Sequence, residues 1–178
     1  NLTNRSYFNL EGQSSGSMLE QTLCLNASTF TEGNAETCPT GRILPVAGTP
    51  MDFTRAKPIG RDIQAEYSQL QMCGGYDHNF ILDKEPGMLA LAAVARSEKT
   101  GITMETYTTQ PGVQLYTSNS LQNDTRPGKT GGIYGRYQGF CLETQHYPCT
   151  PSHPEFPSVE LRPGEEYHET TIYKFLTE

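Results

Sequence analysis

Hydrophobic and polar residues alternate in short runs along most of the chain, and the runs are separated by turn-forming residues. The sequence holds 17 glycines and 12 prolines, spread along its length. Short alternating runs between such turns are typical of antiparallel β proteins. We predict strands at residues 7–10, 19–25, 43–46, 80–82, 88–95, 102–109, 113–117, 139–145 and 167–175.

One segment has the spacing of a helix. Ile63, Tyr67 and Leu70 fall at i, i+4 and i+7, which predicts a helix over 62–70. We therefore expect an all-β fold, a large antiparallel β-sandwich with at most one or two short helices, formed by 1–178 as a single domain. The edges of such sheets must be paired or covered. The first residues look like mid-domain sequence, so we expect a missing N-terminal half or a second copy to cover them.

The strand predicted at 139–145 separates two kinds of side chain. Successive strand residues point to opposite faces of a sheet, so Phe140, Leu142 and Thr144 share one face. The other face carries Glu143 between Cys141 and Gln145. A carboxylate in this place is either a solvated surface group or a general base in a polar pocket. The spacing alone leaves both open.

Charge narrows the choice of partners. The 178 residues carry a net charge of -7, with 20 acidic and 13 basic side chains. No run of five basic residues occurs, so nucleic acid and anionic membranes are poor partners. The longest apolar run, near 88–94, is too short to cross a bilayer.

The cysteines bear on compartment and metal binding. There are five, without a Cys-x-x-Cys pair: Cys24, Cys38, Cys73, Cys141 and Cys149. An odd number without that motif disfavours a disulfide framework and a zinc ribbon. We expect no metal and a reducing, cytoplasmic setting. Against this stand four glycosylation acceptor patterns, at Asn1, Asn4, Asn26 and Asn123.

Two short matches to catalytic motifs lack the required context. Residues 12–16 fit Gly-x-Ser-x-Gly, but a nucleophile elbow needs a strand before it and a helix after it. Residues 128–130 resemble the end of a phosphate-binding loop, but Asn123 stands where its first glycine belongs. The four histidines show no metal-ligand spacing.

What remains is a set of polar groups. Asp77 and His78 begin a strand after two glycines, and Gln110 and Gln114 flank a Pro-Gly turn. Carboxylates and amides near aromatic rings bind sugars, because each sugar hydroxyl both donates and accepts hydrogen bonds. Asp77 has an equally simple alternative, a side chain that stabilises its own turn.

Six segments, in order, resemble the galactose mutarotase (aldose 1-epimerase) family from its middle to its end. They are Asn-Arg-Ser-Tyr-Phe-Asn-Leu at 4–10, Pro-Thr-Gly at 39–41 with Gly-Thr-Pro-Met-Asp-Phe at 48–53, Gly-Tyr-Asp-His-Asn-Phe at 75–80, Thr-Thr-Gln-Pro-Gly-Val-Gln-Leu-Tyr at 108–116, Gly-Phe-Cys-Leu-Glu-Thr-Gln at 139–145, and Leu-Arg-Pro-Gly-Glu at 161–165. The resemblance implies a large antiparallel β-sandwich. It also implies interconversion of the α and β anomers of galactose or glucose without a metal or cofactor, and leaves the preferred aldose open.

The resemblance also implies roles for four residues. Glu143 corresponds to the glutamate that takes the proton from the C1 hydroxyl, and Asp77 and Gln114 correspond to residues of the sugar site. Arg5 stands where the family has its acid histidine. Arginine stays protonated, with a pKa above about 12, and is a very poor proton donor.

Two departures therefore qualify the expected activity: Arg5, and the absence of the family's first half with its further sugar contacts. We carry two alternatives. One is a non-catalytic carbohydrate-binding relative. The other is a structural or interaction module that uses exposed strand edges.

Overall fold

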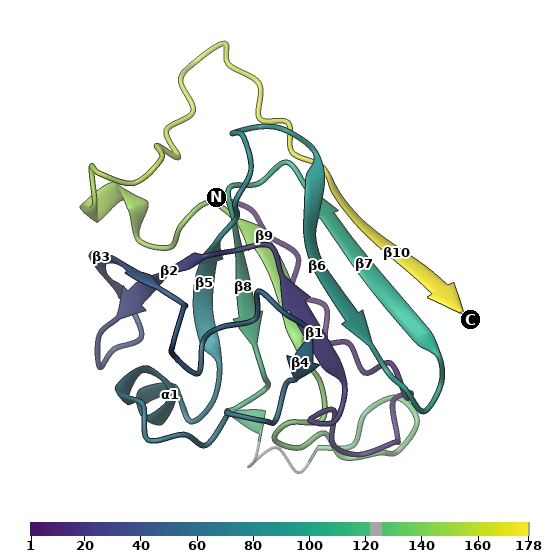
Figure 1. Ribbon diagram of the computed structural model, residues 1–178. Helices are drawn as coiled ribbons and strands as arrows, with labels where there is room; N and C mark the ends of the chain where they lie inside the picture. Colours follow the sequence, from purple (N-terminus) through teal and green to yellow (C-terminus); the bar gives the residue numbers. More distant parts are fainter. Residues whose placement is uncertain (122–125, 178) are drawn as a thin grey trace.

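The chain folds into two antiparallel five-stranded sheets packed face to face (Figure 1). The computed structural model describes residues 1–121 and 126–177. The first sheet has the order β10-β7-β6-β1-β4, with β1 (Thr22–Leu25), β4 (Lys57–Pro58), β6 (Ala90–Arg96), β7 (Ile102–Thr108) and β10 (Thr171–Thr177). The second has the order β3-β2-β5-β8-β9, with β2 (Thr29–Gly33), β3 (Pro39–Pro45), β5 (Asp77–Ile81), β8 (Gly112–Tyr116) and β9 (Cys141–Gln145).

Helical structure is limited to two short segments within the described residues, α1 (Ser68–Cys73) and a 3₁₀ turn (Thr150–Ser152). The expected all-β sandwich is confirmed. No helix in the described part of the chain is long and apolar enough to span a bilayer.

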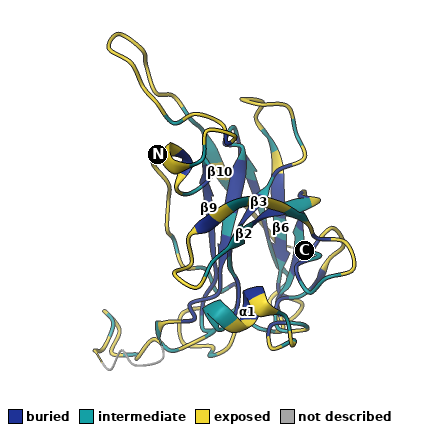
Figure 2. Ribbon diagram, turned by 90° about the vertical axis from the view of Figure 1, so that its left-hand side faces the viewer, coloured by how far each residue is buried: buried dark blue, intermediate teal, exposed yellow. Residues whose placement is uncertain are grey.

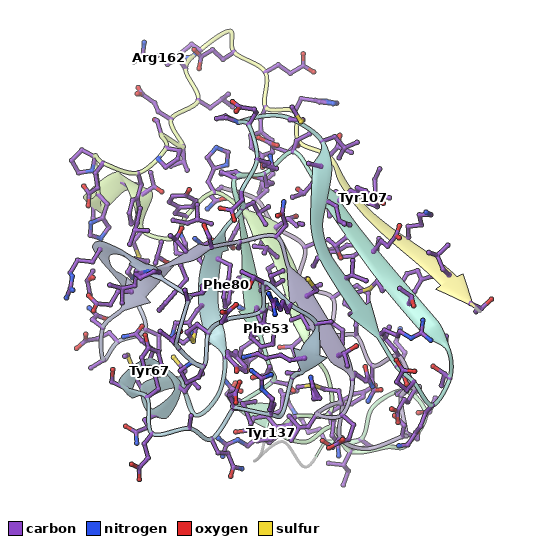
Figure 3. All side chains as sticks on the ribbon, in the orientation of Figure 1. Phe53, Tyr67, Phe80, Tyr107, Tyr137 and Arg162 are labelled. Carbon is purple, nitrogen blue, oxygen red and sulfur yellow. The ribbon has the colours of Figure 1, made fainter. Side chains whose placement is uncertain are left out.

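The core lies between the two sheets. β1 contributes Leu23 and Leu25, and Phe80 of β5 approaches from the other side, with a ring centroid 6.3 Å from that of Phe53. Figure 3 shows Phe53 and Phe80 in the interior of the sandwich. Full burial of such side chains contributes about 1.5–3 kcal/mol each.

The second sheet has an apolar face and a polar face. Phe80, Leu115 and Leu142 alternate toward the core, so their strand neighbours point the other way. All five residues of β9 are buried (Figure 2), which means that its polar face is covered as well. This geometry confirms the predicted split between Leu142 and Glu143.

Most predicted strands occur with shifted ends, but one predicted strand does not form and two observed strands were not predicted. Residues 7–10 form only an isolated bridge, from Phe8 to Phe140. β2 and β4 were not predicted, because Thr29–Gly33 has little apolar alternation and β4 has two residues. The sequence also predicts a long loop over 121–130, and part of it, 122–125, lies outside the described residues.

The predicted helix at 62–70 is wrong over most of its length. α1 begins only at Ser68, and the preceding residues form turns. The Asp62 carboxylate is held by Lys57, with Nζ at 2.8 Å, which fixes the chain in a turn. Ile63 and Leu70 are nevertheless buried, so the periodicity predicted burial correctly. Gly74, in the left-handed region at φ 64°, ends the helix.

Candidate active site

The polar face of the second sheet brings together side chains from three neighbouring strands. Asn79 of β5 pairs with Gln114 of β8, and Gln114 pairs with Glu143 of β9. Asp77 precedes Asn79 by two residues and therefore shares its face. Residues directly opposite in antiparallel strands have Cβ atoms about 4.5–5.5 Å apart, so these side chains form one row.

The four residues predicted from sequence meet here as two pairs. Gln114 Nε2 donates a hydrogen bond to Asp77 Oδ1 at 2.7 Å. Arg5 Nε donates to Glu143 Oε2 at 3.1 Å and lies 3.1 Å from Oε1 as well. The Arg5 guanidinium also lies 5.1 Å from the ring centroid of Tyr116, which allows a cation–π contact.

The N-terminal segment positions Arg5 along β9. Thr3 Oγ1 donates to the carbonyl of Thr144 at 2.8 Å. Phe8 and Phe140 exchange backbone hydrogen bonds of 2.8 and 2.9 Å. Arg5 lies between these two anchors, so its side chain reaches Glu143. The Arg5 side chain is 52% exposed and that of Glu143 only 3%, so Arg5 lies between solvent and a buried carboxylate.

Burial controls the protonation of both carboxylates. Desolvation raises the pKa of Glu143, and the nearby charge of Asp77 adds to this, while Arg5 opposes it. Desolvation also raises the pKa of Asp77, opposed by the Gln114 hydrogen bond and by Arg5. Each acid is therefore a stronger base than an exposed carboxylate.

Buried polar atoms without a hydrogen-bond partner concentrate in this row. The described residues have five such side-chain atoms, and four lie here: Asn79 Nδ2, Asn79 Oδ1, Gln114 Oε1 and Glu143 Oε1, the last in ion-pair contact with Arg5 but without a hydrogen bond. An unsatisfied buried group costs about 1–3 kcal/mol. Among the described residues, this row is therefore the place where buried polar groups are least satisfied.

Asn79 was missed as a site residue in the sequence, although it lies two residues after Asp77. The period of two along a strand was the signal that could have found it. Gly112 faces it closely, since a Cβ at Gly112 would lie 2.6 Å from Asn79 Oδ1. β8 can approach Asn79 only because this residue has no side chain.

His78 and Gln110, two other polar residues considered in the sequence, do not join the row. His78 points to the core, edge-on to Phe30 at 5.9 Å, and burial lowers its pKa to about 4. It therefore stays neutral and faces away from Glu143. Gln110 instead donates to the Tyr167 hydroxyl at 2.8 Å.

Two cavities adjoin Asp77. One of about 420 Å³ is lined by Asp77, Tyr116, Asn119 and Ser120, among others, a size usual for small-molecule pockets, about 300–1,000 Å³. The other, of about 20 Å³, is lined by Asp77, Asn79 and Gln114 with residues of neighbouring loops. Asp77 thus faces both a space large enough for a ligand and the polar row.

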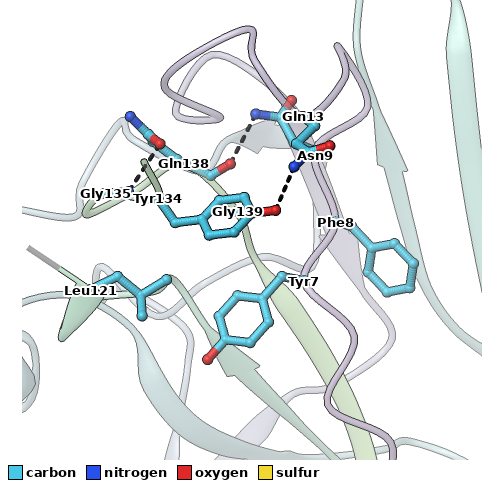
Figure 4. Close-up of a pocket in the computed structure, with 9 residues that line it drawn as sticks. All are labelled: Tyr7, Phe8, Asn9, Gln13, Leu121, Tyr134, Gly135, Gln138 and Gly139. Atoms are coloured by element: carbon cyan, nitrogen blue, oxygen red, sulfur yellow. Dashed lines mark hydrogen bonds between the residues drawn. The ribbon is translucent and has the colours of Figure 1, made fainter. Parts of the chain in front are cut away.

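A larger cavity of about 590 Å³ lies elsewhere, beside Tyr7 and Tyr134 (Figure 4). Several of its polar groups already have partners: Gln13 donates to the Tyr134 hydroxyl at 2.5 Å, and Asn9 donates to the Gln138 carbonyl at 2.9 Å. None of the residues that line this cavity carries a carboxylate or an imidazole. The polar row, unlike this cavity, holds carboxylates.

Comparison with known sequences identifies the family. The family model described as aldose 1-epimerase matches residues 1–174. The chain belongs to the aldose 1-epimerase family. It is 44% identical over 177 residues to the galactose mutarotase of Homo sapiens, covering 98% of this chain and 49% of that protein. It is 35% identical over 180 residues to the aldose 1-epimerase of Escherichia coli (strain K12), covering 100% of this chain and 51% of that protein.

Solved structures of the aldose 1-epimerase family have the same architecture. The aldose epimerase homologue from C. elegans superposes with a TM-score of 0.83 at 31% identity, over 98% of this chain and 50% of that one. The galactose 1-epimerase from Lactobacillus acidophilus gives a TM-score of 0.81 at 27% identity, over 98% and 48%. The chain spans about half the length of the relatives it matches.

Proposed function

We propose that this chain acts on hexoses such as galactose or glucose and interconverts their α and β anomers. The observation that carries the proposal is the meeting of Asp77, Gln114, Glu143 and Arg5 on one sheet face. Family membership and the galactose mutarotase relatives support it. We also propose a reducing, cytoplasmic setting.

In the proposed reaction, Glu143 is the general base. Its carboxylate takes the proton from the C1 hydroxyl. The electrons of the O1–H bond form the C1 carbonyl, and the bond from C1 to the ring oxygen breaks. The ring oxygen takes up a proton, the C1–C2 bond rotates, and the reverse steps close the ring. Asp77 and Gln114 hold sugar hydroxyls while this happens.

Arg5 would limit this reaction in two ways. It hydrogen-bonds to Glu143, so it must move before the carboxylate reaches the C1 hydroxyl. Its half-exposed side chain leaves room for this. It can then donate a hydrogen bond to the ring oxygen but cannot give up a proton at neutral pH, so solvent must supply that proton. We expect slow turnover.

Polarimetry of freshly dissolved α-D-galactose tests the proposal. The chain should speed relaxation to the anomeric equilibrium, and Glu143→Gln should abolish the acceleration. Arg5→His should increase the rate, because a well-placed general acid contributes about 10²–10⁴-fold. A wild-type rate equal to that of Glu143→Gln would contradict the enzymatic proposal.

The Arg5–Glu143 ion pair favours a second candidate, a non-catalytic sugar-binding relative. An arginine that stays on the carboxylate would leave hydroxyl binding intact and remove the base. Saturable galactose binding without acceleration, together with activity gained by Arg5→His, would select this candidate over the first.

A further inference from the structure

Two cysteines far apart in the sequence lie together at the rim of the second sheet. Cys38 immediately precedes β3, and Cys149 immediately precedes the 3₁₀ turn. Both are exposed thiols. Burial raises the pKa of Cys149, and a side-chain interaction with Cys38 raises it further. The geometry that brings the two cysteines near each other is the contact between the loops that carry them.

One hydrogen bond and one close packing contact between the two loops hold this arrangement independently of the thiols. His153 Nε2 donates to the carbonyl of Pro39 at 3.0 Å, one residue beyond Cys38. Two residues further, Gly41 packs so closely against His153 and Glu155 that a Cβ there would lie 2.9 and 2.5 Å from their side chains. The strand after Cys38 is thus fastened to the turn after Cys149.

Each cysteine is also held by its own loop. The Asn34 side chain accepts a hydrogen bond from the Cys38 amide at 3.0 Å. The Cys149 carbonyl accepts one from Ser152 at 2.9 Å. Preset backbones of this kind reduce the rearrangement needed to bridge two sulfurs.

The chain neighbours of both cysteines line one small cavity. Thr37 and Pro39 flank Cys38, Pro148 precedes Cys149, and these three residues line the cavity of about 20 Å³. Asp77, Asn79 and Gln114 line the same cavity. The two loops therefore form a wall next to the polar row, and both cysteines are exposed beside the residues of that wall.

The other cysteines lie in different surroundings. Cys141 is buried, and Cys24 and Cys73 are half-buried. Cys73 Sγ lies 4.0 Å from His78 Nε2, and Cys24 Sγ lies 3.6 Å from the Thr54 carbonyl. Cys38 and Cys149 are thus the two exposed thiols of the five. A single disulfide between them is compatible with an odd number of cysteines, because the other three remain free.

We propose that Cys38 and Cys149 are a reversible redox couple whose disulfide clamps the loops 34–38 and 146–152 together beside the polar row. The Cys38 thiolate attacks a small disulfide such as oxidised glutathione. This forms a mixed disulfide and releases one glutathione thiol. The Cys149 thiolate then attacks the Cys38 sulfur, and a second glutathione leaves. The two protein thiols lose two protons and two electrons, which reduce the small disulfide to two thiols.

The clamp has two consequences. Closing a long loop of chain restricts the unfolded state, so the oxidised form should be harder to unfold. It also fixes the wall beside Asp77 and Asn79. If the proposed function holds, a preorganised wall should strengthen galactose binding by several-fold. This second consequence rests on the proposed function, and the first does not.

The test is to treat the full chain with oxidised glutathione and map its peptides under non-reducing conditions by tandem mass spectrometry. A peptide that joins Cys38 to Cys149 is expected, lost on adding dithiothreitol. Oxidation should raise the melting temperature by roughly 5–15 °C. Cys38→Ser and Cys149→Ser should each lose both effects, and the matched control Cys24→Ser should keep both.

Recovery of Cys38 and Cys149 as free thiols or as separate glutathione adducts would overturn the couple. A link between two chains rather than within one would overturn it too. Because these readouts need no sugar, they are independent of the proposed function. An intramolecular link without a change in affinity, in a chain that binds galactose, would overturn the clamp's effect on the polar row.

Discussion

The charge on Glu143 depends on a balance between burial and a single cation. The side chain is 3% exposed, and its only charged partner in the described part of the chain at hydrogen-bond distance is Arg5. Burial dominates, since the pKa of Glu143 is raised despite the arginine. A base with a raised pKa accepts a proton more readily, which suits removal of a hydroxyl proton.

This balance predicts a pH dependence. The folded state holds the Glu143 proton above the pH at which an exposed glutamate, with a pKa near 4.5, loses it. Between the pKa of the unfolded state and the higher pKa of the folded state, the unfolding free energy falls as pH rises. Over the same range Glu143 becomes the deprotonated carboxylate that can act as a base. Mutarotation should therefore increase with pH along a limb above 4.5. Arg5→Gln should move that limb to higher pH, because the opposing cation is gone. The measurement is initial-rate polarimetry as a function of pH. If the rise in rate occurs at the same pH in Arg5→Gln, it reports the titration of a group other than Glu143.

The position of Asn79 in the polar row predicts that its side chain contributes to sugar binding. Both polar atoms of its side chain are buried without a partner and lie in the row with Gln114. Asn79→Ala should weaken galactose binding by roughly 2–10-fold, the value of one neutral hydrogen bond. Gln71→Ala, on the exposed side of α1, is the control for non-specific effects. Calorimetric titration measures both, and unchanged affinity in Asn79→Ala would remove the residue from the site.

At the scale of elements, β4 and the turn after it depend on a buried lysine. Lys57 is 2% exposed, and its Nζ donates to Asp62 at 2.8 Å and to the Pro50 carbonyl at 2.7 Å. It also lies 4.1 Å from the Phe53 ring centroid. These contacts anchor the turn that replaces the predicted helix, and they connect it to the core.

The lysine predicts an asymmetric response to mutation. Asp62→Asn leaves a buried cation without its counter-charge and should lower the unfolding free energy by about 2–3 kcal/mol. Lys57→Met removes the buried charge itself and should cost less than about 1 kcal/mol. Arg61→Gln, which changes only the exposed partner of Asp62, should have little effect. Urea unfolding gives all three values, and an Asp62→Asn cost no larger than that of Lys57→Met would contradict the explanation.

The elements also show what the sequence could and could not predict. The period of two correctly predicted which β9 side chains share a face. Both faces of β9 are buried, one against the apolar core and one in the polar row. The predicted helix at 62–70 is replaced by turns, in which Lys57 and Asp62, five residues apart, form an ion pair. The same period of two places Asn79 on the face of Asp77, but its pairing with Gln114 could not be predicted, because a single strand does not reveal which residues lie opposite it.

At the scale of the whole molecule, hydrogen bonds link the two sheets beside the site. Thr144 of β9 and Thr171 of β10 share a hydrogen bond of 2.6 Å, and the Tyr173 hydroxyl donates to the Leu142 carbonyl at 2.8 Å. β9 and β10 are edge strands of different sheets, so these bonds close one side of the sandwich. We predict that the other two edge strands, β4 and β3, are covered by further chain or by a second copy. Light scattering tests the second copy, because it measures the mass of the particle in solution.

The central claim is that the polar row on β5, β8 and β9 holds a hexose. Titration of isotope-labelled chain with galactose, followed through backbone amide chemical shifts, tests it most directly. We predict saturable shifts centred on Asp77, Gln114 and Glu143, weakened in Asp77→Asn. Saturable shifts confined to the cavity beside Tyr7 and Tyr134, or no saturable shifts at all, would contradict the claim.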